Sequence, residues 1–346
     1  MKLFCANDWH YGVLRSAGTT PQSAWALRQY ILTRSEVLLD QIDGPLVFNG
    51  DLFDAAQVPN NDFLQALGIF RKWLAKGHHL YLGRANHDVH RVTSLLSSFD
   101  LFGELLKTLA PDQVTVVTAP TAIPEHNAYM VPHLINQDAF DLALTRVPAV
   151  DTLFVHCNYD NHFAQESDHS LNMSEEQAKA LPVKRIIFGH EHQAKSALNG
   201  KVIVVGNQIP SSISDCLGND AKYLIAIENG QIETIPVWDA AEEFSEVPWT
   251  ATEDVNPSAQ FVRVTGTVTP AQASDAIAAI SLLRKSHTAF VVANATKPEV
   301  RDGETEKLNL ETIQSYDILA ALLKRLTPQQ AEVVKQLLKE HDVSPT

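Results

Sequence analysis

The stretch at residues 47–54, V-F-N-G-D-L-F-D, constrains the fold of this chain more than any other. An apolar run reaches Gly50, and the carboxylates Asp51 and Asp54 follow it. This pattern predicts a buried strand that delivers both carboxylates into a cleft at its C-terminal edge. We interpret Asp51 as a bridge between two metal ions. Because G-D-x-x-D also arises in ordinary loops, the hypothesis requires further ligands elsewhere in the chain.

Other apolar segments of the chain end in metal-binding residue types in the same way. The predicted strands cover residues 2–7, 46–49, 78–82, 152–155 and 183–188. The candidate ligands that follow these strands are, in chain order, Asp8, His10, Asp51, Asn86, His156, His190 and His192. Since parallel strands end at a common edge of a sheet, these side chains are predicted to meet there.

The candidate ligands form a mixed set of nitrogen and oxygen donors. Such a set suits Mn(II), Fe(II) or Zn(II) better than Mg(II) or Ca(II), which prefer oxygen-only shells. Each residue also has a structural alternative. A histidine at a strand end is more often a hydrogen-bonded structural residue, and Asp8 or Asn86 could close a turn. The repetition of the pattern at five strand ends favours the metal centre.

Amphipathic segments with helical spacing separate the predicted strands. They cover residues 21–42, 62–76, 92–110, 140–146 and 173–181. Alternating strands and helices predict an α/β fold over residues 1–240. Two hairpins are predicted to turn at Asn199-Gly200 and Asn229-Gly230, because Asn-Gly favours tight turns between strands.

The C-terminal third has a different composition. Residues 239–258 are acidic, contain Pro and lack periodicity, which predicts a linker. A strand-helix-strand module follows at residues 261–293, so residues 241–300 are predicted to form a linker and a small α/β capping domain. Residues 309–346 are predicted to be a tail of two amphipathic helices that binds a partner. The same helices could instead pack on their own domain.

Charge and cysteine content limit the classes of function. The net charge of -14 argues against a protein that wraps nucleic acid unaided, although bound cations would invert the local sign. No apolar run approaches the roughly 20 residues of a membrane span, so no membrane association is expected. Three cysteines without metal-ribbon spacing indicate reduced thiols, and the first residues do not read as a signal peptide. A cytoplasmic location is expected.

The order D-x-H, G-D-x-x-D, N-H-D, a lone H and G-H-x-H resembles the calcineurin-like metallophosphoesterase superfamily, over roughly residues 1–240. The resemblance implies a four-layer αββα sandwich and a two-metal hydrolase of phosphate esters. It implies Asp8, His10, Asp51 and His192 on one ion, and Asp51, Asn86, His156 and His190 on the other.

The resemblance implies roles for two further residues, and the chain departs from the family pattern at one position. It implies that His87 contacts the phosphate or protonates the leaving group, and Asp54 is placed to orient His87. The alternative for Asp54 is a helix N-cap. Where the family usually has Gly before N-H-D, this chain has Ala85, which is expected to carry modest strain if the turn needs a positive φ.

The segments G-D-L-F-D, N-H-D-V-H and G-N-Q-I-P-S-S resemble the Mre11/SbcD nuclease branch. That resemblance implies a Mn(II)-dependent DNA exonuclease and endonuclease subunit, acting in DNA repair, recombination or replication. It also implies a homodimer within a heterotetramer, with the tail on a Rad50/SbcC-type ATPase. Candidate DNA contacts, each of which could equally be a solvated surface residue, are Arg84, His90, Arg91, Lys184, Arg185 and Lys195.

Two other functions stay open. The same chemistry serves a phosphodiesterase that acts on cyclic nucleotides or dinucleotides. A chain with a vestigial site could also act as a non-catalytic scaffold that binds a coiled coil through its tail. The complete ligand set speaks against the scaffold.

Overall fold

The structure, a computed structural model, describes residues 2–13, 20–90, 95–161, 170–218 and 220–299. The described residues up to Lys297 form one compact unit. The predicted tail helices and Arg91 lie outside the described residues, and the division at residue 240 stays a prediction. Within the described part of the chain, no helix combines the length and apolar character needed to cross a membrane.

The first sheet has six strands in the order β14-β13-β1-β2-β3-β4. They are β1 (Leu3–Ala6), β2 (Leu46–Phe48), β3 (Leu80–Gly83), β4 (Val114–Val117), β13 (Ala221–Glu228) and β14 (Gln231–Asp239). Strands β1 to β4 are parallel, whereas β13 runs antiparallel to both β1 and β14. The predicted hairpin at Asn229-Gly230 is confirmed, since it joins β13 to β14 with a positive φ at both residues.

The second sheet also has six strands, in the order β11-β12-β10-β7-β6-β5. They are β5 (Thr121–Ile123), β6 (Ala128–Val131), β7 (Val150–His156), β10 (Val183–Gly189), β11 (Lys195–Ala197) and β12 (Val202–Val204). Strands β6, β7, β10 and β12 are parallel, and the edge strands β5 and β11 are antiparallel to their neighbours. A short pair, β8 (Asn158–Tyr159) with β9 (Asn172–Met173), follows β7.

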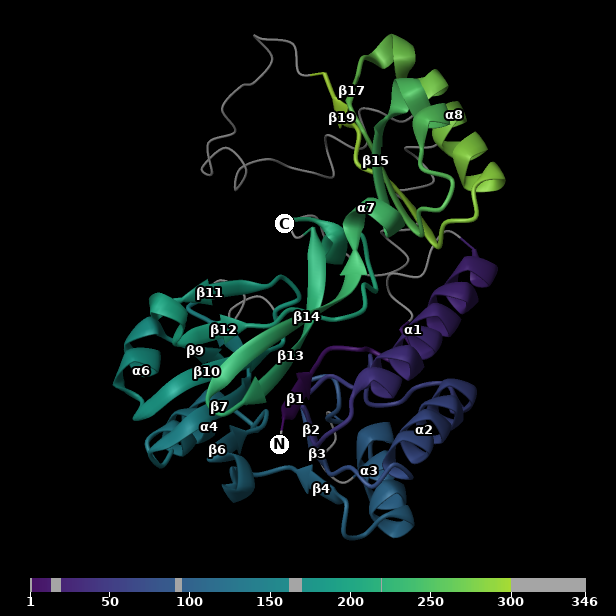
Figure 1. The fold of residues 1–346 in the computed structure, drawn as a ribbon. Helices are drawn as coiled ribbons and strands as arrows, with labels where there is room; N and C mark the ends of the chain where they lie inside the picture. Colours follow the sequence, from purple (N-terminus) through teal and green to yellow (C-terminus); the bar gives the residue numbers. More distant parts are fainter. Residues whose placement is uncertain (1, 14–19, 91–94, 162–169, 219, 300–346) are drawn as a thin grey trace, which may run out of the picture. The chain divides into compact units, whose positions relative to one another are not determined.

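Among the described residues, five helices cover the outer faces of the sheets. They are α1 (Pro21–Gln41), α2 (Asn60–Leu74), α3 (Ser98–Leu109), α4 (Gln137–Leu144) and α6 (Glu175–Ala180). Figure 1 shows the first three beside the first sheet and α4 and α6 beside the second. Helix α3 begins later than predicted because Ser97 and Asp100 form a capping box there. Helix α4 begins earlier than predicted, since Asn136 caps it before its first apolar residue.

The layers pack on one another through three apolar cores. One packs α1, α2 and α3 on the first sheet and includes Phe48, Phe70 and Phe102, while another packs α4 and α6 on the second sheet. The third lies between the sheets, where Val47 and Phe154 take part from opposite sides. Because each sheet buries both faces, its central strands are almost wholly apolar. The predicted α/β sandwich of four layers is therefore confirmed.

The region after β14 contains a small parallel sheet in the order β15-β16-β18. Its elements are α7 (Ala240–Glu243), β15 (Phe244–Pro248), β16 (Phe261–Thr265), β17 (Thr267–Val268), α8 (Ala273–Ser286), β18 (Val291–Asn294) and β19 (Lys297–Pro298). Residues from the sheet and α8 share their own apolar core. The predicted linker at residues 239–258 is wrong, because β15 lies inside it and pairs with β16.

Candidate metal centre

The candidate ligands follow the carboxyl ends of strands from both large sheets. Asp8 and His10 follow β1, Asp51 follows β2, and His190 follows β10. The loops after β1 and β2 are paired, since the Asp8 N–H donates to the Gly50 carbonyl oxygen and the His10 N–H to that of Asp51. The two sheets also meet here, because the His190 N–H donates to the Asp8 carboxylate at 3.1 Å.

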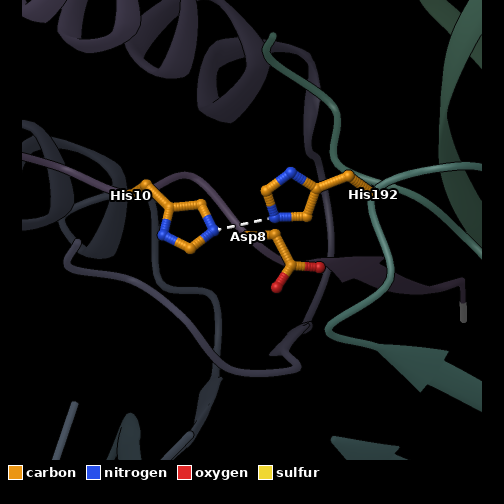
Figure 2. Close-up of side chains that lie close together, drawn as sticks. All are labelled: Asp8, His10 and His192. Atoms are coloured by element: carbon orange, nitrogen blue, oxygen red, sulfur yellow. Dashed lines mark hydrogen bonds between the residues drawn. The ribbon is translucent and has the colours of Figure 1, made fainter. Parts of the chain in front are cut away.

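One group of candidate ligands consists of Asp8, His10 and His192, whose ligand atoms all lie within 4.8 Å of one another. Figure 2 shows the two imidazole rings turned toward each other above the Asp8 carboxylate. Their Nε2 atoms are 3.0 Å apart. Asp8 and His10 are buried. Two imidazole nitrogens that converge beside a buried carboxylate fit a cation between them.

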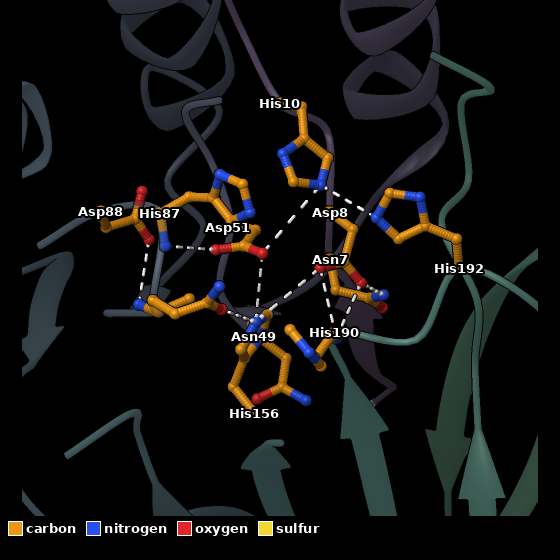
Figure 3. A network of polar contacts seen from close by, with 12 residues as sticks. Asn7, Asp8, His10, Asn49, Asp51, His87, Asp88, His156, His190 and His192 are labelled. Carbon is orange, nitrogen blue, oxygen red and sulfur yellow. Dashed lines mark hydrogen bonds and ion pairs between the residues drawn. The ribbon is translucent and has the colours of Figure 1, made fainter. Parts of the chain in front are cut away.

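A second group consists of Asp51, His156 and His190, again with ligand atoms within 4.8 Å of one another. The Asp51 Oδ2 atom lies 3.2 Å from His156 Nε2 and 4.0 Å from His10 Nε2, so this carboxylate faces both groups (Figure 3). Asn86 joins the second group, because its Oδ1 atom is 3.1 Å from His156 Nε2. All seven predicted ligands therefore lie together, with Asp51 between the two sets.

Hydrogen bonds fix which imidazole nitrogen faces the cluster. His156 Nδ1 lies 2.8 Å from the Asn49 carbonyl oxygen, and His192 Nδ1 lies 2.7 Å from Asp215 Oδ1. With Nδ1–H donating to these oxygens, Nε2 of each ring faces the other candidate ligands. Partners of this kind orient metal-binding histidines and set their tautomer.

The electrostatics of the cluster favour bound cations. Burial lowers the pKa of His10 well below its usual range, which keeps the ring neutral and able to bind metal. Burial also lowers the pKa of His156, but the charge and hydrogen bond of Asp51, together with the Asp8 charge, outweigh burial and raise the pKa to about 9. Burial raises the pKa of Asp51, but the charge and hydrogen bond of His156, with the charges of His87 and His10, outweigh burial and hold the pKa well below its usual range. The ionised carboxylate thus draws positive charge to the nitrogen that faces it.

Four candidate ligands have a backbone conformation that side chains other than glycine rarely adopt. They are Asp8, His10, Asp51 and His190, with φ of 56°, 49°, 51° and 89°. Strain of this kind gathers at functional sites. Ala85 is not among the described residues with positive φ, so the strain expected there is absent. Its backbone N–H instead donates to Asp88 Oδ2 at 3.0 Å.

Gly50 permits the close approach of His156 to the first sheet. Its φ is +93°, and a Cβ atom at this position would lie 2.3 Å from His156 Nδ1. We expect Gly50→Ala to lower the free energy of unfolding by about 2 kcal/mol or more, because an L residue in this region costs roughly 1–2 kcal/mol before the clash is counted. Denaturant unfolding measures this.

Gly68→Ala is the matched control, since Gly68 lies in α2 with nothing within 4 Å of a new Cβ atom. It should stabilise the chain by up to about 1 kcal/mol, as alanine favours a helix over glycine. Equal unfolding midpoints for the Gly50 variant and the wild type would contradict the crowding at His156.

His87 lies beside the cluster rather than inside one of the two predicted sets. Its N–H donates to Asp51 Oδ1 at 3.1 Å, and its Nδ1 atom lies 2.7 Å from the Asp54 carbonyl oxygen. The Asp54 carboxylate lies 3.6 Å from His10 Nδ1. Asp54 therefore orients His87 through its main chain, and the role predicted for its carboxylate stays a prediction. His87 also lies close enough to His10 and Asp51 to share a metal with them.

Several residues that support the site carry no clear signal in the sequence. The Asp88 carboxylate accepts from the N–H groups of Phe53 and Ala85, and thereby joins the loops after β2 and β3. Burial, and then the charge of Asp51, raise the pKa of Asp88 well above its usual range. Gln208 is likewise buried and accepts from the Asn7 N–H, next to Asp8. Only its place in G-N-Q-I-P-S-S could have suggested this role.

The candidate ligands open into a cleft of about 460 Å³. Its walls include Asn158, Glu191, Ser211, Ser212 and Ser214, in addition to His87 and members of both ligand sets. A cleft of this volume is in the range of small-molecule sites and admits a phosphate ester with its neighbouring groups.

None of the predicted DNA contacts within the described residues lines this cleft. Lys184 forms an ion pair with Asp151 at 2.8 Å, and Arg185 donates to the Gly230 carbonyl oxygen. Both lie near the amino end of β10, whereas His190 follows its carboxyl end. Lys195 is closer, paired at 2.5 Å with the cleft residue Glu191.

The remaining predicted contacts follow β3. Arg84 donates to the Thr118 carbonyl oxygen at 3.3 Å. His90 is partly buried in the loop that carries Asn86 and His87, and Arg91 lies outside the described residues. A DNA-binding role for each of these residues stays a prediction.

A two-sheet sandwich with clustered aspartates and histidines at its strand ends defines a metal-dependent hydrolase. A family model described as calcineurin-like phosphoesterase matches residues 1–194. The match covers more than half of the 346 residues, so the chain belongs to the calcineurin-like phosphoesterase family. It is accordingly a metal-dependent enzyme that hydrolyses ester bonds, and members of this family use two metal ions.

Other comparisons are distant. A search of curated proteins found no significant match. Among solved structures, a novel archaeal phosphodiesterase is 10% identical with a TM-score of 0.34, over 68% of this chain and 99% of that chain. A cold-active protein-tyrosine phosphatase from a psychrophilic Shewanella species is 14% identical with a TM-score of 0.32, over 67% and 80%. The family assignment comes from the match over residues 1–194 alone.

Proposed function

We propose that this protein is a DNA exonuclease and endonuclease subunit of the Mre11/SbcD type, which hydrolyses phosphodiester bonds with two Mn(II) ions. The observation that carries the proposal is the position of Asp51, whose carboxylate faces both sets of candidate ligands. Asp8, His10 and His192 would hold one ion with Asp51. Asn86, His156 and His190 would hold the other. The mixed nitrogen and oxygen donors suit Mn(II).

The chain's own residues would bind and orient the substrate and move one proton. Two bound ions would supply a hydroxide near neutral pH and stabilise the charge that develops on the phosphate. With Nδ1 of His87 directed to the Asp54 carbonyl oxygen, the protonated ring can donate its Nε2 proton to the leaving oxygen. Ser212 and Ser214 line the cleft near His192 and can donate to a substrate.

The proposal of DNA as substrate draws on the segment G-N-Q-I-P-S-S. In this segment, Gln208 accepts a hydrogen bond from the N–H of Asn7, which precedes Asp8. Ser211 and Ser212 line the cleft. The segment that resembles the nuclease branch therefore contributes side chains to the site, and this supports the proposal.

A phosphodiesterase of cyclic nucleotides or dinucleotides is the second candidate. Three observations favour it. The net charge is -14, and Lys184 and Lys195 are each paired with a carboxylate of the protein. The volume of the cleft also suits a dinucleotide.

The two candidates differ in the substrate they turn over. The purified full chain with Mn(II) should release nucleotides from linear duplex or single-stranded DNA and should leave cyclic dinucleotides intact. Gel and chromatographic assays measure both reactions under the same conditions. Turnover of the dinucleotides with DNA untouched would replace the first proposal with the second.

The proposed partner is a Rad50/SbcC-type ATPase, bound through residues 309–346. Support comes from the sequence of these residues, where Ile313, Tyr316 and Leu319 begin an apolar stripe at helical spacing. A pull-down with the coiled-coil base of such an ATPase tests it. The full chain should be retained and a chain that ends at residue 308 should not, and equal retention of both would refute the tail as the docking site.

A further inference from the structure

Asp215 lies outside the motifs that supply the candidate ligands, yet it contacts one of them directly. Its Oδ1 atom is 2.7 Å from His192 Nδ1. Asp215 is buried, with 2% of its surface exposed, whereas the His192 ring is partly open to the cleft. Asp215 belongs to the short helical turn Ser214–Cys216 rather than to a strand end.

The other oxygen of Asp215 is held by the main chain around it. Oδ2 accepts from Ser211 N–H at 2.8 Å, from Ser211 Oγ at 3.0 Å and from Ser212 N–H at 3.0 Å. Three donors on one oxygen leave the other oxygen in a fixed position against His192. The carboxylate is thus rigid where it meets the ring, whereas His192 itself follows β10 on a loop.

His192 needs such a partner more than His10 and His156 do. Its side chain is 28% exposed, while those of His10 and His156 are 4% and 1% exposed. Packing therefore restrains His10 and His156, but the Asp215 contact restrains the rotation of the His192 ring. That rotation decides whether Nε2 faces His10 Nε2, which is 3.0 Å away.

We propose that Asp215 is a positioning residue that holds His192 with Nε2 toward Asp8 and His10, and so strengthens the binding of one of the two ions. The inference builds on the metal centre of the proposed function and adds a residue to it. It also assigns Asp215 to one of the two ions, because the ligand it contacts is His192, whose ligand atoms gather with those of Asp8 and His10.

The experiment compares Mn(II) binding by the full chain and its variants, with calorimetry and with the electron spin resonance of free Mn(II). Asp215→Asn keeps the shape of the side chain and removes its charge, and Asp215→Ala removes the contact. In both we expect one ion to bind as in the wild type and the other to bind about 10-fold to 100-fold more weakly, the effect typical of such partners.

Asp151→Asn is the matched control, because it makes the same chemical change at the start of β7, where Asp151 pairs with Lys184. It should leave both affinities unchanged. Thermal unfolding in the presence of a chelator reports any effect on the metal-free chain. If Asp215→Ala fails to fold, the isosteric Asp215→Asn decides the result.

Selective weakening of one ion supports the inference. Two ions bound with wild-type affinity in the Asp215 variants would overturn it, and so would equal weakening of both ions with a lower melting temperature, which marks a purely structural role. The binding readout is independent of the substrate. A wild-type chain that binds two ions but leaves DNA intact would therefore refute the nuclease proposal while the inference stands.

Discussion

Asp51→Asn should abolish turnover and remove bound metal. The Asp51 carboxylate lies between the two sets of candidate ligands, 3.2 Å from His156 Nε2 and 4.0 Å from His10 Nε2. Asparagine keeps the shape but supplies a neutral oxygen. The ion held with Asn86, His156 and His190 would lose its carboxylate ligand, and the other ion would keep only that of Asp8. Because bound ions stabilise the transition state by several kcal/mol, we expect turnover to fall by about 10³-fold or more. Elemental analysis after gel filtration measures the metal, and single-turnover assays measure the rate.

The control for Asp51→Asn is again Asp151→Asn, at the far end of the second sheet. It should keep both the metal content and the rate. Denaturant unfolding of the metal-free proteins separates a lost ligand from a lost fold. Full metal content in the Asp51 variant, with turnover within about tenfold of the wild type, would show that Asp51 is not the bridge.

His87→Ala should leave the metal content unchanged and still lose most of the turnover. The structure holds the His87 ring against the Asp54 carbonyl oxygen, beside the cluster, where it can protonate a leaving group. A general acid of this kind contributes about 10²-fold to 10⁴-fold to the rate. The loss should be much smaller for a p-nitrophenyl ester than for DNA, because p-nitrophenolate leaves without a proton. Parallel rate measurements on both substrates report this difference.

His79→Ala is a suitable control for this variant. His79 precedes β3 at its amino end, where its ring contacts Thr115, and His87 follows the carboxyl end of the same strand. The control should retain both activities. His87 also lies near His10 and Asp51, at distances that a shared metal would permit. Parallel loss of metal and turnover in His87→Ala would make His87 a ligand and refute the division of roles between His87 and Asp51.

Local patterns were sufficient to predict an α/β fold and the candidate ligands, and the resemblance to a known family implied the four-layer sandwich. A buried strand needs a continuous apolar run, and a polar residue just after it marks the end of the strand, as with Phe48 and Asp51. The strand at Phe244–Pro248 could not be found in this way. It has few apolar residues, and it is a strand because β16 pairs beside it along its whole length. Strands of this kind form because of pairing with segments distant in the sequence, which a local pattern does not reveal.

The same limit explains what was missed at the site. His192 could be predicted as a candidate ligand from G-H-x-H, but Asp215 follows it by 23 residues and lies in a serine-rich turn. Nothing in the local sequence indicates that its carboxylate faces the ring. For Ala85, the expectation of strain came from the usual Gly at that position. The chain avoids this strain because Asp88 accepts the Ala85 N–H and holds the loop in an ordinary conformation.

Each set of candidate ligands draws on both sheets of the sandwich. Asp8 and His10 come from the first sheet and His192 from the second, and Asn86 likewise faces His156 across the interface. An ion in either position would therefore act as a cross-link between the two halves of the domain. Binding to the folded state alone stabilises it in proportion to the logarithm of free ligand. The free energy of unfolding of this enzyme would thus rise with the concentration of free metal. Removal of the metal would lower the stability of the domain and also abolish its activity.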